Sequence, residues 1–522
     1  MPAILDNLPD FGSLLLSREQ MRAYDALAMA SCKIPGTILM ENAGRGAAEK
    51  IGRLLAKTAE KPRVVILCGT GNNGGDGFVV ARQLVAERRL AATVTLFVHG
   101  APTDIKGDAK INLDILLALG QRVLFSDDFS LPDFAAELGK ATIAVDALFG
   151  TGLSRALTAE AQRLVGEFNR FAGPRVSLDL PSGLDADTGQ VLGLAVRATH
   201  TVTFAHAKPG MLTPAGSEHC GEITVVHTGH DDTDILRQTG PAARVLTATG
   251  VAAWLSPRIK GTFKHRSGDA IVFAGSPGKT GAAHLAALAA LRAGAGLVTI
   301  ATASEAVPAI AQSADEIMLL SLPDSASATD LEALIQKRSS VALGPGFGLS
   351  AEAKLLSERL WQECATVLTV DADGLTNIAG AAAAIHPRIL TPHSGEMARL
   401  LGITPAEVER DRYAAVRVAA KRYHAVVVLK GAHSLIGAPD GETFVSPWAN
   451  PALATAGSGD VLTGIICALA ADLEPFAAAS AGVYLHGLAA HLWCEENHAD
   501  RGMVASDIIA RLPAASGLLV SR

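Results

Sequence analysis

Short apolar segments of strand character alternate with Ala-rich helical segments along this chain, and a polar stretch at residues 229–243 interrupts the alternation. Strands separated by helices are typical of parallel, doubly wound sheets. The strands predicted in the first half are Val64–Cys68, Thr93–Val98, Ile143–Asp146, Val176–Leu180 and Thr201–Phe204. Those predicted in the second half are Ala270–Gly275, Leu297–Ala301, Val341–Gly344, Val367–Asp371, Ile389–Thr391 and Val426–Lys430, followed by a hairpin over His433–Gly437 and Glu442–Ser446.

The length of the chain supports a division into two domains. A chain of 522 residues exceeds what a single core usually supports. The polar stretch has the composition of a linker between domains. We therefore predict two α/β domains, residues 1–228 and 244–522, joined by a linker at residues 229–243, and the first is a Rossmann-like doubly wound parallel sheet.

Composition excludes several classes of protein. The 45 basic and 52 acidic residues give a net charge of −7, and aromatic residues make up only 4%, so neither a basic field nor stacking platforms favour nucleic acid. The six cysteines are scattered without a CxxC pair, which favours reduced thiols over a disulfide or zinc framework. No signal peptide pattern and no run of about 18 uncharged apolar residues is present. We expect a cytoplasmic protein without a membrane partner.

A Gly-rich segment near the C-terminus, Ala456-Gly-Ser-Gly-Asp460, directly precedes an apolar helix predicted over residues 461–471. Small residues let backbone amides crowd around an anion at the positive end of a helix. A carboxylate beside such a cradle repels a phosphate, unless its task is to take a proton from a hydroxyl that attacks phosphorus. Asp460 is therefore a candidate catalytic base, and the alternative is a simple N-cap residue in a Gly-rich turn.

The first half carries a loop, Gly69 to Gly77, between a predicted strand and a helix predicted over residues 77–88. Its glycines match the dinucleotide-binding fingerprint, but the next strand ends Phe97-Val-His-Gly100 without the acidic residue that binds ribose. This absence weakens the interpretation as an ordinary NAD-dependent dehydrogenase. Asn72, Asn73 and Asp76 add side-chain oxygens that a plain phosphate loop does not need.

Three further loops follow predicted strands of the first half and begin at Asp146, Asp179 and Thr203. Loops at the carboxyl ends of parallel strands converge on one crevice. Oxygens of Asn73, Asp146 and Ser182 could form a cation site there. Asp179, placed at a strand end before Pro181, is the best carboxylate for acid–base chemistry, and a turn or capping role is the alternative.

The second half has loops of the same kind. Gly275-Ser-Pro-Gly-Lys-Thr-Gly281 is not a Walker A loop, because Phe273 stands where the first glycine is required. His393 is a candidate contact to phosphate or sugar, although a lone loop histidine is more often incidental. His486 and His491 lie among apolar helix positions and are interpreted as structural.

Taken together, the motifs carry a family resemblance. The N-terminal half resembles the NAD(P)HX epimerase domain of the YjeF N-terminal type, through Gly-Asn-Asn-Gly-Gly-Asp-Gly, Asp-Ala-Leu-Phe-Gly-Thr-Gly, Asp-Leu-Pro-Ser-Gly-Leu-Asp and His-Ala-Lys-Pro-Gly. The C-terminal half resembles the ADP-dependent NAD(P)HX dehydratase, a ribokinase-like α/β domain, through Gly-Pro-Gly-Phe-Gly, Leu-Thr-Pro-His-Ser-Gly-Glu, Leu-Lys-Gly-Ala-His-Ser and Asn-Pro-Ala-Leu-Ala-Thr-Ala-Gly-Ser-Gly-Asp. The motifs follow one another along the chain in the order of the fused bacterial repair enzyme that the two halves resemble.

The resemblance implies an activity and a set of site residues. One domain interconverts the R and S epimers of NADHX and NADPHX, and the other returns S-NAD(P)HX to NAD(P)H while ADP becomes AMP and phosphate. The residues implied to bind the hydrate in the epimerase domain are Asn72, Asn73, Gly74, Gly75, Asp76, Gly150, Thr151, Gly152, Leu153, Ser154, Arg155 and Asp179, with Asp179 as the catalytic group. Those implied in the dehydratase domain are Ala282, Gly346, His393 and Asp460 for the hydrate, with Asp460 catalytic, and Lys430, Gly431, Ala432, His433, Ser434 and Gly459 for the nucleotide.

The resemblance also implies metal ions. Potassium is expected on Asn73, Asp146 and Ser182, and Mg²⁺ is expected in the dehydratase domain. Ala-rich helices that could pack between subunits favour a homo-oligomer. The alternative function is a ribokinase-like kinase of a small-molecule hydroxyl, with a non-catalytic binding domain in front of it.

Overall fold

The computed structural model describes residues 13–57, 61–87, 89–258, 260–312, 315–323, 325 and 330–520. The predicted domain ends at residues 1 and 522, and the predicted helix end at residue 88, lie outside these ranges. The described chain separates into an N-terminal unit that ends at Val245 and a C-terminal unit that begins at Leu246. No helix of the described ranges is long and apolar enough to cross a bilayer.

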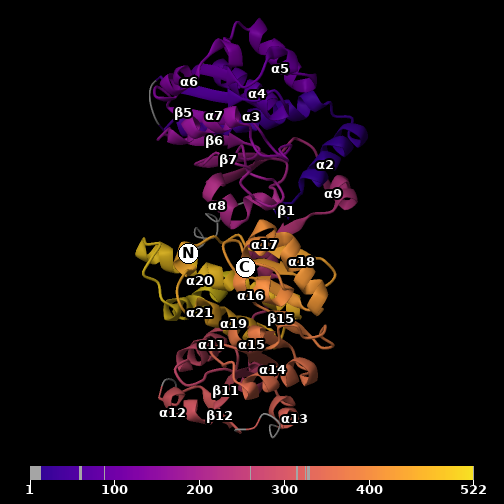
Figure 1. The fold of residues 1–522 in the computed structure, drawn as a ribbon, viewed down its shortest axis with the longest axis vertical. Coiled ribbons are helices and arrows are strands. Elements are labelled where there is room, and N and C mark those ends of the chain that lie inside the picture. Colours follow the sequence, from indigo (N-terminus) through magenta and orange to yellow (C-terminus); the bar gives the residue numbers. More distant parts are fainter. Residues whose placement is uncertain are drawn as a thin grey trace. The chain divides into compact units, whose positions relative to one another are not determined.

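The N-terminal unit is built on a parallel sheet of seven strands in the order β4-β3-β2-β5-β6-β7-β8. The neighbouring strands β5, β6 and β7 are labelled in Figure 1. The strands of this unit are β1 (Leu14–Leu15), β2 (Arg63–Cys68), β3 (Thr93–Val98), β4 (Val123–Phe125), β5 (Ile143–Ala147), β6 (Arg175–Leu178), β7 (His200–Phe204), β8 (Glu222–Val226) and β9 (Ala243–Val245). Its α-helices are α2 (Arg18–Ser31), α3 (Gly36–Leu55), α4 (Asn72–Ala86), α5 (Gly107–Ala118), α6 (Leu131–Leu138), α7 (Ala159–Arg170), α8 (Pro214–Cys220) and α9 (Thr233–Thr239).

Alternate residues of β2 enter two different cores. Ile66 packs with α3, α4 and α5 on one face of the sheet, and Leu67 packs with α6 and α7 on the other. This arrangement confirms the predicted doubly wound parallel sheet. The segment predicted as a linker, residues 229–243, contains the helix α9.

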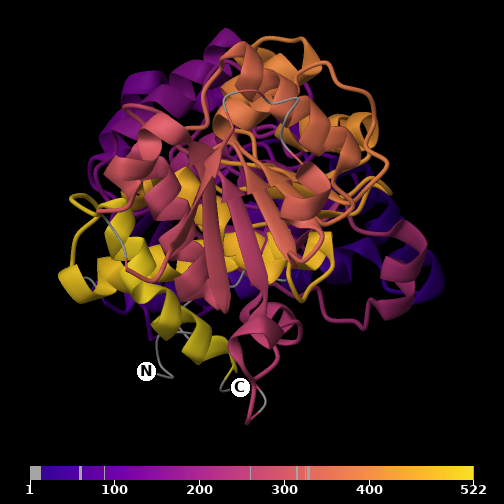
Figure 2. The same cartoon turned by 90° about the horizontal axis from the view of Figure 1, so that it is seen from below.

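The C-terminal unit has a mixed sheet, and several of its strands are seen side by side in Figure 2. The strands follow the order β18-β17-β16-β15-β14-β13-β10-β11-β12. Its strands are β10 (Asp269–Phe273), β11 (Leu297–Ala303), β12 (Met318–Leu322), β13 (Ser340–Leu343), β14 (Leu368–Val370), β15 (Arg388–Leu390), β16 (Val426–Leu429), β17 (Leu435–Gly437) and β18 (Thr443–Val445). Its α-helices are α10 (Ala248–Ala252), α11 (Thr280–Ala293), α12 (Val307–Ile310), α13 (Leu331–Ile335), α14 (Ala351–Glu363), α15 (Ala372–Asn377), α16 (Ser394–Leu401), α17 (Pro405–Arg410), α18 (Arg412–Tyr423), α19 (Ser458–Leu469), α20 (Pro475–Asn497) and α21 (Ala505–Val520).

Between β16 at one side and β12 at the edge, all neighbouring strands of this sheet pair in parallel, including β10 and β11. The predicted hairpin forms the antiparallel pair β17–β18. Helices α11 and α19 pack together against β10 and β13 through small residues, and a Cβ on Gly464 would lie 2.0 Å from the Ala286 carbonyl oxygen. This close approach places the N-terminus of α19, with Asp460, beside the carboxyl ends of the strands.

Five strands of the described chain were not predicted from the sequence, namely β1, β4, β8, β9 and β12. Strands β1 and β9 are only two and three residues long. Strands β4, β8 and β12 lie at an edge of a sheet, and most of their side chains are half-buried or exposed. Edge strands lack the continuous apolar run that identifies a central parallel strand.

Candidate functional sites

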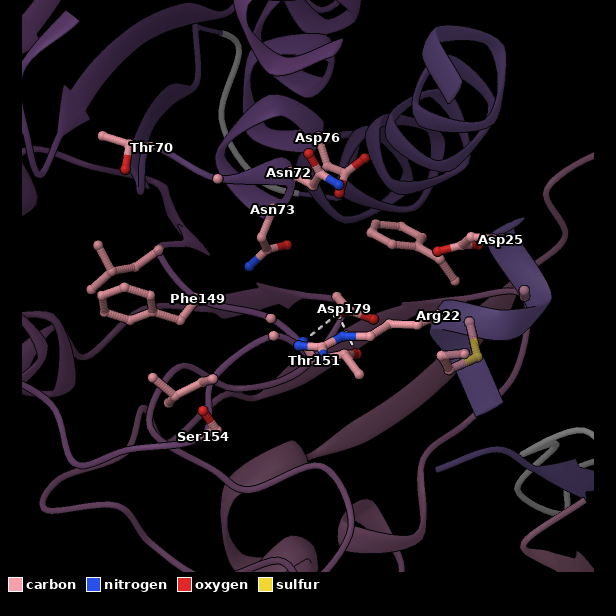
Figure 3. Close-up of a pocket in the computed structure, with 18 of the residues that line it drawn as sticks. Arg22, Asp25, Thr70, Asn72, Asn73, Asp76, Phe149, Thr151, Ser154 and Asp179 are labelled. Carbon is pink, nitrogen blue, oxygen red and sulfur yellow. Dashed lines mark hydrogen bonds between the residues drawn. The ribbon is translucent and has the colours of Figure 1, made fainter. Parts of the chain in front are cut away.

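A cavity of about 570 Å³ lies at the carboxyl ends of β2, β5 and β6 in the N-terminal unit (Figure 3). The chain runs from β2 to β3 on one side and returns to β5 on the other, so the cavity lies at the switch point where α/β sheets bind ligands. The predicted residues that line it are Asn72, Asn73, Asp76, Gly150, Thr151, Gly152, Leu153, Ser154, Arg155 and Asp179.

Asp179 directly follows β6 and adopts a left-handed backbone conformation, with φ of +63°. Its Oδ2 atom accepts hydrogen bonds from the backbone amide and the hydroxyl of Thr151, both at 2.7 Å. Its Oδ1 atom accepts a hydrogen bond of 2.6 Å from the ammonium of Lys208. These partners lie 28 and 29 residues away, so the carboxylate does more than stabilise its own turn.

The carboxyl groups around the cavity differ in proton affinity. Burial favours a raised pKa for Asp179, but the Lys208 charge and the hydrogen bonds from Lys208 and Thr151 outweigh burial and lower the pKa. Burial and the nearby charges of Asp179 and Asp25 raise the pKa of Asp76 well above its ordinary value. Burial raises the pKa of Asp25 to about 6. The cavity thus holds one ionised carboxylate beside weaker acids, a pattern typical of acid–base sites.

The Gly-rich segment after β2 differs from its prediction. Helix α4 begins at Asn72 rather than at residue 77, so the first two turns of the helix include Asn72 to Gly77. Gly74 and Gly75 do not line the cavity, because their Cα atoms pack inward. A Cβ on Gly74 would lie 1.9 Å from the Gly69 carbonyl oxygen, and one on Gly75 would lie 2.7 Å from the Met40 sulfur.

Asn73, Asp146 and Ser182 were predicted to bind a cation. Asp146 is fully buried, and its Oδ1 atom accepts a hydrogen bond of 2.6 Å from the Ser182 hydroxyl. The Ser182 hydroxyl also lies 3.0 Å from the Phe149 carbonyl oxygen. Both polar atoms of the Asn73 side chain are buried and have no hydrogen-bond partner among the described residues. The Asn73 amide adjoins the loop that follows Phe149, because a Cβ on Gly150 would lie 3.3 Å from the Asn73 Cγ atom. An unpaired buried amide together with carboxylate, hydroxyl and carbonyl oxygens is the kind of ligand set that a monovalent cation takes.

The sequence did not identify the contribution of α2 to the cavity. Arg22 and Asp25 extend from this helix and line the cavity (Figure 3). The predicted capping box at Ser17–Gln20 is present and starts the helix. Arg18 then joins α2 to the site through hydrogen bonds to the Thr151 carbonyl oxygen at 2.9 Å and to Asp185 at 2.6 Å. No local signal reveals a contact across 133 residues.

Asp460 lies in the first turn of α19 in the C-terminal unit, and Gly457, with φ of +82°, is the N-cap. The N-cap of this helix carries no side-chain capping hydrogen bond, and Asp460 lies three residues beyond it, so the interpretation of Asp460 as the N-cap is wrong. The pKa of Asp460 is raised to about 7. Burial is the largest cause, the charges of Asp371, Asp373 and Glu396 also raise the pKa, and the charge of Lys430 lowers it. A carboxyl group that titrates near neutral pH is suited to general base catalysis.

Lys430 stands beside Asp460 and follows β16. Its ammonium donates a hydrogen bond of 2.6 Å to Asp371 Oδ1 and lies 3.7 Å from Glu396. Thr463 donates to Asp371 Oδ2 at 2.7 Å, and a Cβ on Gly459 would lie 3.4 Å from the Lys430 Nζ atom. Burial lowers the pKa of Lys430, but the charges of Asp371 and Glu396 outweigh burial and raise the pKa. The predicted nucleotide residues Lys430 and Gly459 thus come together.

The remaining predicted residues lie in several elements of the C-terminal unit. Ala282 lies in the first turn of α11, and it adjoins Gly346, because a Cβ on Gly346 would lie 3.2 Å from the Ala282 Cβ. His393 is the N-cap of α16 and accepts a hydrogen bond of 3.0 Å from the Gly395 amide. The ring of His433 is buried and lies 2.9 Å from the Ser446 carbonyl oxygen, within the β17–β18 hairpin. Gly431 and Ser434 are joined by a hydrogen bond of 3.2 Å in the exposed turn that also contains Ala432.

His486, interpreted from the sequence as structural, is buried beneath the N-terminus of α19. Its Nε2 atom lies 3.2 Å from the Ser458 hydroxyl and 3.0 Å from the Ser458 carbonyl oxygen. His491 packs against the ring of Trp448. Burial lowers the pKa of His486 to about 4, so this ring supports the Gly-rich turn as a neutral group.

The two units and their sites define a two-domain α/β protein, in which a domain with a doubly wound parallel sheet precedes a domain with a mixed sheet. The family model of the YjeF-related protein N-terminus matches residues 36–210, and the model of NAD(P)H-hydrate dehydratase matches residues 270–514. The bifunctional NAD(P)H-hydrate repair enzyme Nnr of Moorella thermoacetica is 39% identical over 514 residues, which cover 96% of each chain. The enzyme of the same name from Escherichia coli is 34% identical and covers 86% of this chain and 84% of its own.

Among solved structures, the ADP/ATP-dependent NAD(P)H-hydrate dehydratase from Bacillus subtilis, co-crystallized with ATP and Mg²⁺, is 30% identical. It covers 53% of this chain and 98% of its own, with a TM-score of 0.47. The full-length similarity to the repair enzymes decides the assignment. The chain belongs to the family of bifunctional NAD(P)H-hydrate repair enzymes.

Proposed function

We propose that the cavity around Asp179 epimerises NAD(P)HX and that the site around Asp460 dehydrates the S epimer with ADP as phosphoryl donor. The observation that carries the proposal is Asp460, a carboxylate with a pKa near 7 at the N-terminus of α19, beside the Lys430 ammonium. The two sites would together return both epimers to NAD(P)H.

Hydroxide is a poor leaving group, so direct loss of the C6 hydroxyl is slow. In the proposed reaction Asp460 takes the hydroxyl proton while that oxygen attacks the β-phosphorus of ADP, and the bond to the bridging oxygen breaks to release AMP. Backbone amides at Gly457 to Gly459 and the Lys430 cation stabilise the developing charge. Phosphate then leaves with the C6–O electron pair, water takes the C5 proton, and the C5–H electron pair forms the C5–C6 double bond of the ring.

The same geometry would serve a kinase that phosphorylates a stable hydroxyl. A kinase would accumulate a phosphorylated product, whereas the dehydratase releases inorganic phosphate and NADH. The family assignment over both units favours the dehydratase. Mg²⁺ would accompany the nucleotide, because this ion is usually held by one or two carboxylates together with phosphates.

A turnover assay tests this function. Mixed R and S NADHX is incubated with the full chain, potassium, Mg²⁺ and either ADP or ATP, and NADH absorbance and AMP are followed. Complete conversion with ADP is the expected result. Conversion that stops at the S fraction would remove the epimerase assignment, and a stable phosphorylated product would support a kinase.

Potassium is proposed to bind at Asn73, Asp146 and Ser182 in the epimerase cavity. A cation there would compensate the buried charge of Asp146. Burial raises the pKa of this carboxyl group, although the hydrogen bonds from Ser182 lower it. It would also fix the loop at Phe149 and Gly150, which adjoins Asp179. A Cβ on Gly150 would lie 2.4 Å from Asp179 Oδ2 and 3.3 Å from the Asn73 Cγ atom.

Asn73→Ala is expected to weaken potassium binding about 10–100-fold, the range typical of a lost metal-site partner. Because a ligand that binds only the folded state stabilises it, potassium should raise the unfolding temperature of the wild-type protein above its value in an equal concentration of choline chloride. The variant should lose most of this increase, while Asn72→Ala should keep it. An equal potassium effect in wild type and Asn73→Ala would remove Asn73 from the site.

A further inference from the structure

Lys208 is a buried cation within the His-Ala-Lys-Pro-Gly motif, and its role was not predicted from the sequence. Its side chain is 1% exposed. The ammonium donates to Asp179 Oδ1 at 2.6 Å, to the Thr203 hydroxyl at 2.7 Å and to the Phe204 carbonyl oxygen at 3.3 Å. An ammonium has three donors, so each proton of Lys208 is already engaged and none is available to a substrate.

The hydrogen bonds of Asp179 leave one direction open. A carboxylate has about four acceptor sites, two on each oxygen. Thr151 occupies both sites of Oδ2, and Lys208 occupies one site of Oδ1. The remaining acceptor site is therefore on Oδ1, the oxygen that Lys208 holds.

On the premise that this cavity is the epimerase site, we propose that Lys208 is a positioning residue that presents Asp179 Oδ1 to the C6 hydroxyl of the hydrate. Asp179 accepts the hydroxyl proton at a fixed atom while the oxygen forms a C=O bond and the C6–N1 bond breaks, with its electron pair passing to N1. The open-chain aldehyde rotates, N1 adds to its other face, and Asp179 returns the proton to the C6 oxygen of the epimer. Lys208 itself transfers no proton. Its contribution is to orient the carboxylate and to keep it ionised.

The groups that face Asp179 explain why a buried cation is needed. Asp25 from α2 and Asp76 from α4 line the same cavity, and Arg22 and Arg155 also line it. Neither arginine has a described hydrogen bond to Asp179, whereas Lys208 is in direct contact with it. Without Lys208, burial would raise the pKa of Asp179, as burial does for Asp25 and Asp76.

The test is the pH dependence of epimerisation by full-length Lys208→Met, measured from about pH 5 to 9 with R-NADHX. We expect kcat to fall about 100-fold at neutral pH, as for a misplaced catalytic group, with KM little changed. The base form of Asp179 is lost as pH falls through its pKa, so a raised pKa moves the acid limb of the profile to higher pH. The variant should therefore recover part of its loss as pH rises.

Two variants separate this role from simple support of the fold. Lys208→Gln keeps a donor but no charge and should show the same displaced acid limb with a smaller loss. Thr203→Val removes one partner of Lys208 and keeps its contact with Asp179, so it should lower the rate without moving the profile. Near-ultraviolet circular dichroism and dehydration of pure S epimer check the folding of each protein.

The outcomes distinguish this inference from the proposed function. Wild-type protein without epimerase activity would remove both the function of the cavity and the role of Lys208. Active wild-type protein, with both Lys208 variants reduced by a constant factor at every pH, would overturn the positioning role alone. A displaced acid limb in both Lys208 variants but not in Thr203→Val would support it.

Discussion

Asp460→Asn is expected to leave the chain folded and to slow ADP-dependent dehydration about 10²–10⁴-fold, the usual cost of losing a general base. Asparagine preserves the shape of the side chain but cannot accept the C6 hydroxyl proton. The measurement is NADH formation from pure S-NADHX at saturating ADP. Epimerisation of R-NADHX by the same protein serves as the control, because Asp179 and its partners lie in the other unit.

The pH dependence adds a second expectation for Asp460. Its pKa of about 7 means that the base form is present above neutral pH, so kcat/KM of wild-type protein should rise with pH through about 7. The groups that face it are Asp371, Asp373, Glu396 and Lys430. The pH profile of Asp460→Asn should lack this rise in kcat/KM. Unchanged turnover in Asp460→Asn would reject the role of Asp460 as base.

The same raised pKa has a consequence for stability. The folded state binds a proton at Asp460 that the unfolded chain has released above its ordinary pKa of 3.8, so this group contributes less stability as pH rises toward 7. At pH 8 Asp460→Asn should therefore unfold at a temperature no lower than wild type. Such a result would show that the lost activity does not arise from a weakened fold.

The predicted central strands and site loops could be found from the sequence because local and global signals agree there. Continuous apolar runs marked the buried strands β2 and β5, and the polar or Gly-rich residues that follow them marked the carboxyl ends of the sheet. Asp179 and Asp460 were identified for this reason. In both sites the structure brings the predicted carboxylate into a group of strand-end residues.

The start of α4 was mispredicted because intrinsic propensity and packing disagree. Glycines disfavour a helix by about 1 kcal/mol each relative to alanine, which favoured a loop up to residue 77. In the structure Gly74 and Gly77 allow the helix to approach Gly69 and Cys68 closely, and a Cβ on either would collide with them. Tertiary contacts therefore outweigh the local preference, and no local pattern reports such contacts.

The partners of the site residues were also beyond local patterns. The sequence contained Lys208 within a recognised motif, but its contact with Asp179 spans 29 residues. Arg22 and Asp25 reach the cavity only because α2 is held against the Thr151 loop. Long-range placement of this kind follows from the assembled sheet and not from spacing along the chain.

Asp179→Asn is expected to slow epimerisation about 10²–10⁴-fold and to spare dehydration of pure S epimer. Asparagine is suited to this position because it tolerates the left-handed backbone at φ of +63°, which would strain most other side chains. Its neutral amide cannot hold the proton that Asp179 accepts. In a mixed sample of R and S NADHX, rapid NADH formation by the variant should therefore end at the S fraction.

The control for Asp179→Asn is dehydration, the activity proposed for the C-terminal unit, which the substitution does not change. The substitution leaves the buried ammonium of Lys208 without its counter-ion, which is costly and should lower the unfolding temperature of the N-terminal unit. The proposed dehydration site, with Asp460 and Lys430, lies in the C-terminal unit, so dehydration should proceed at the wild-type rate. Loss of both activities in a folded protein would argue against two separate sites, whereas loss of epimerisation alone assigns one carboxylate to each reaction.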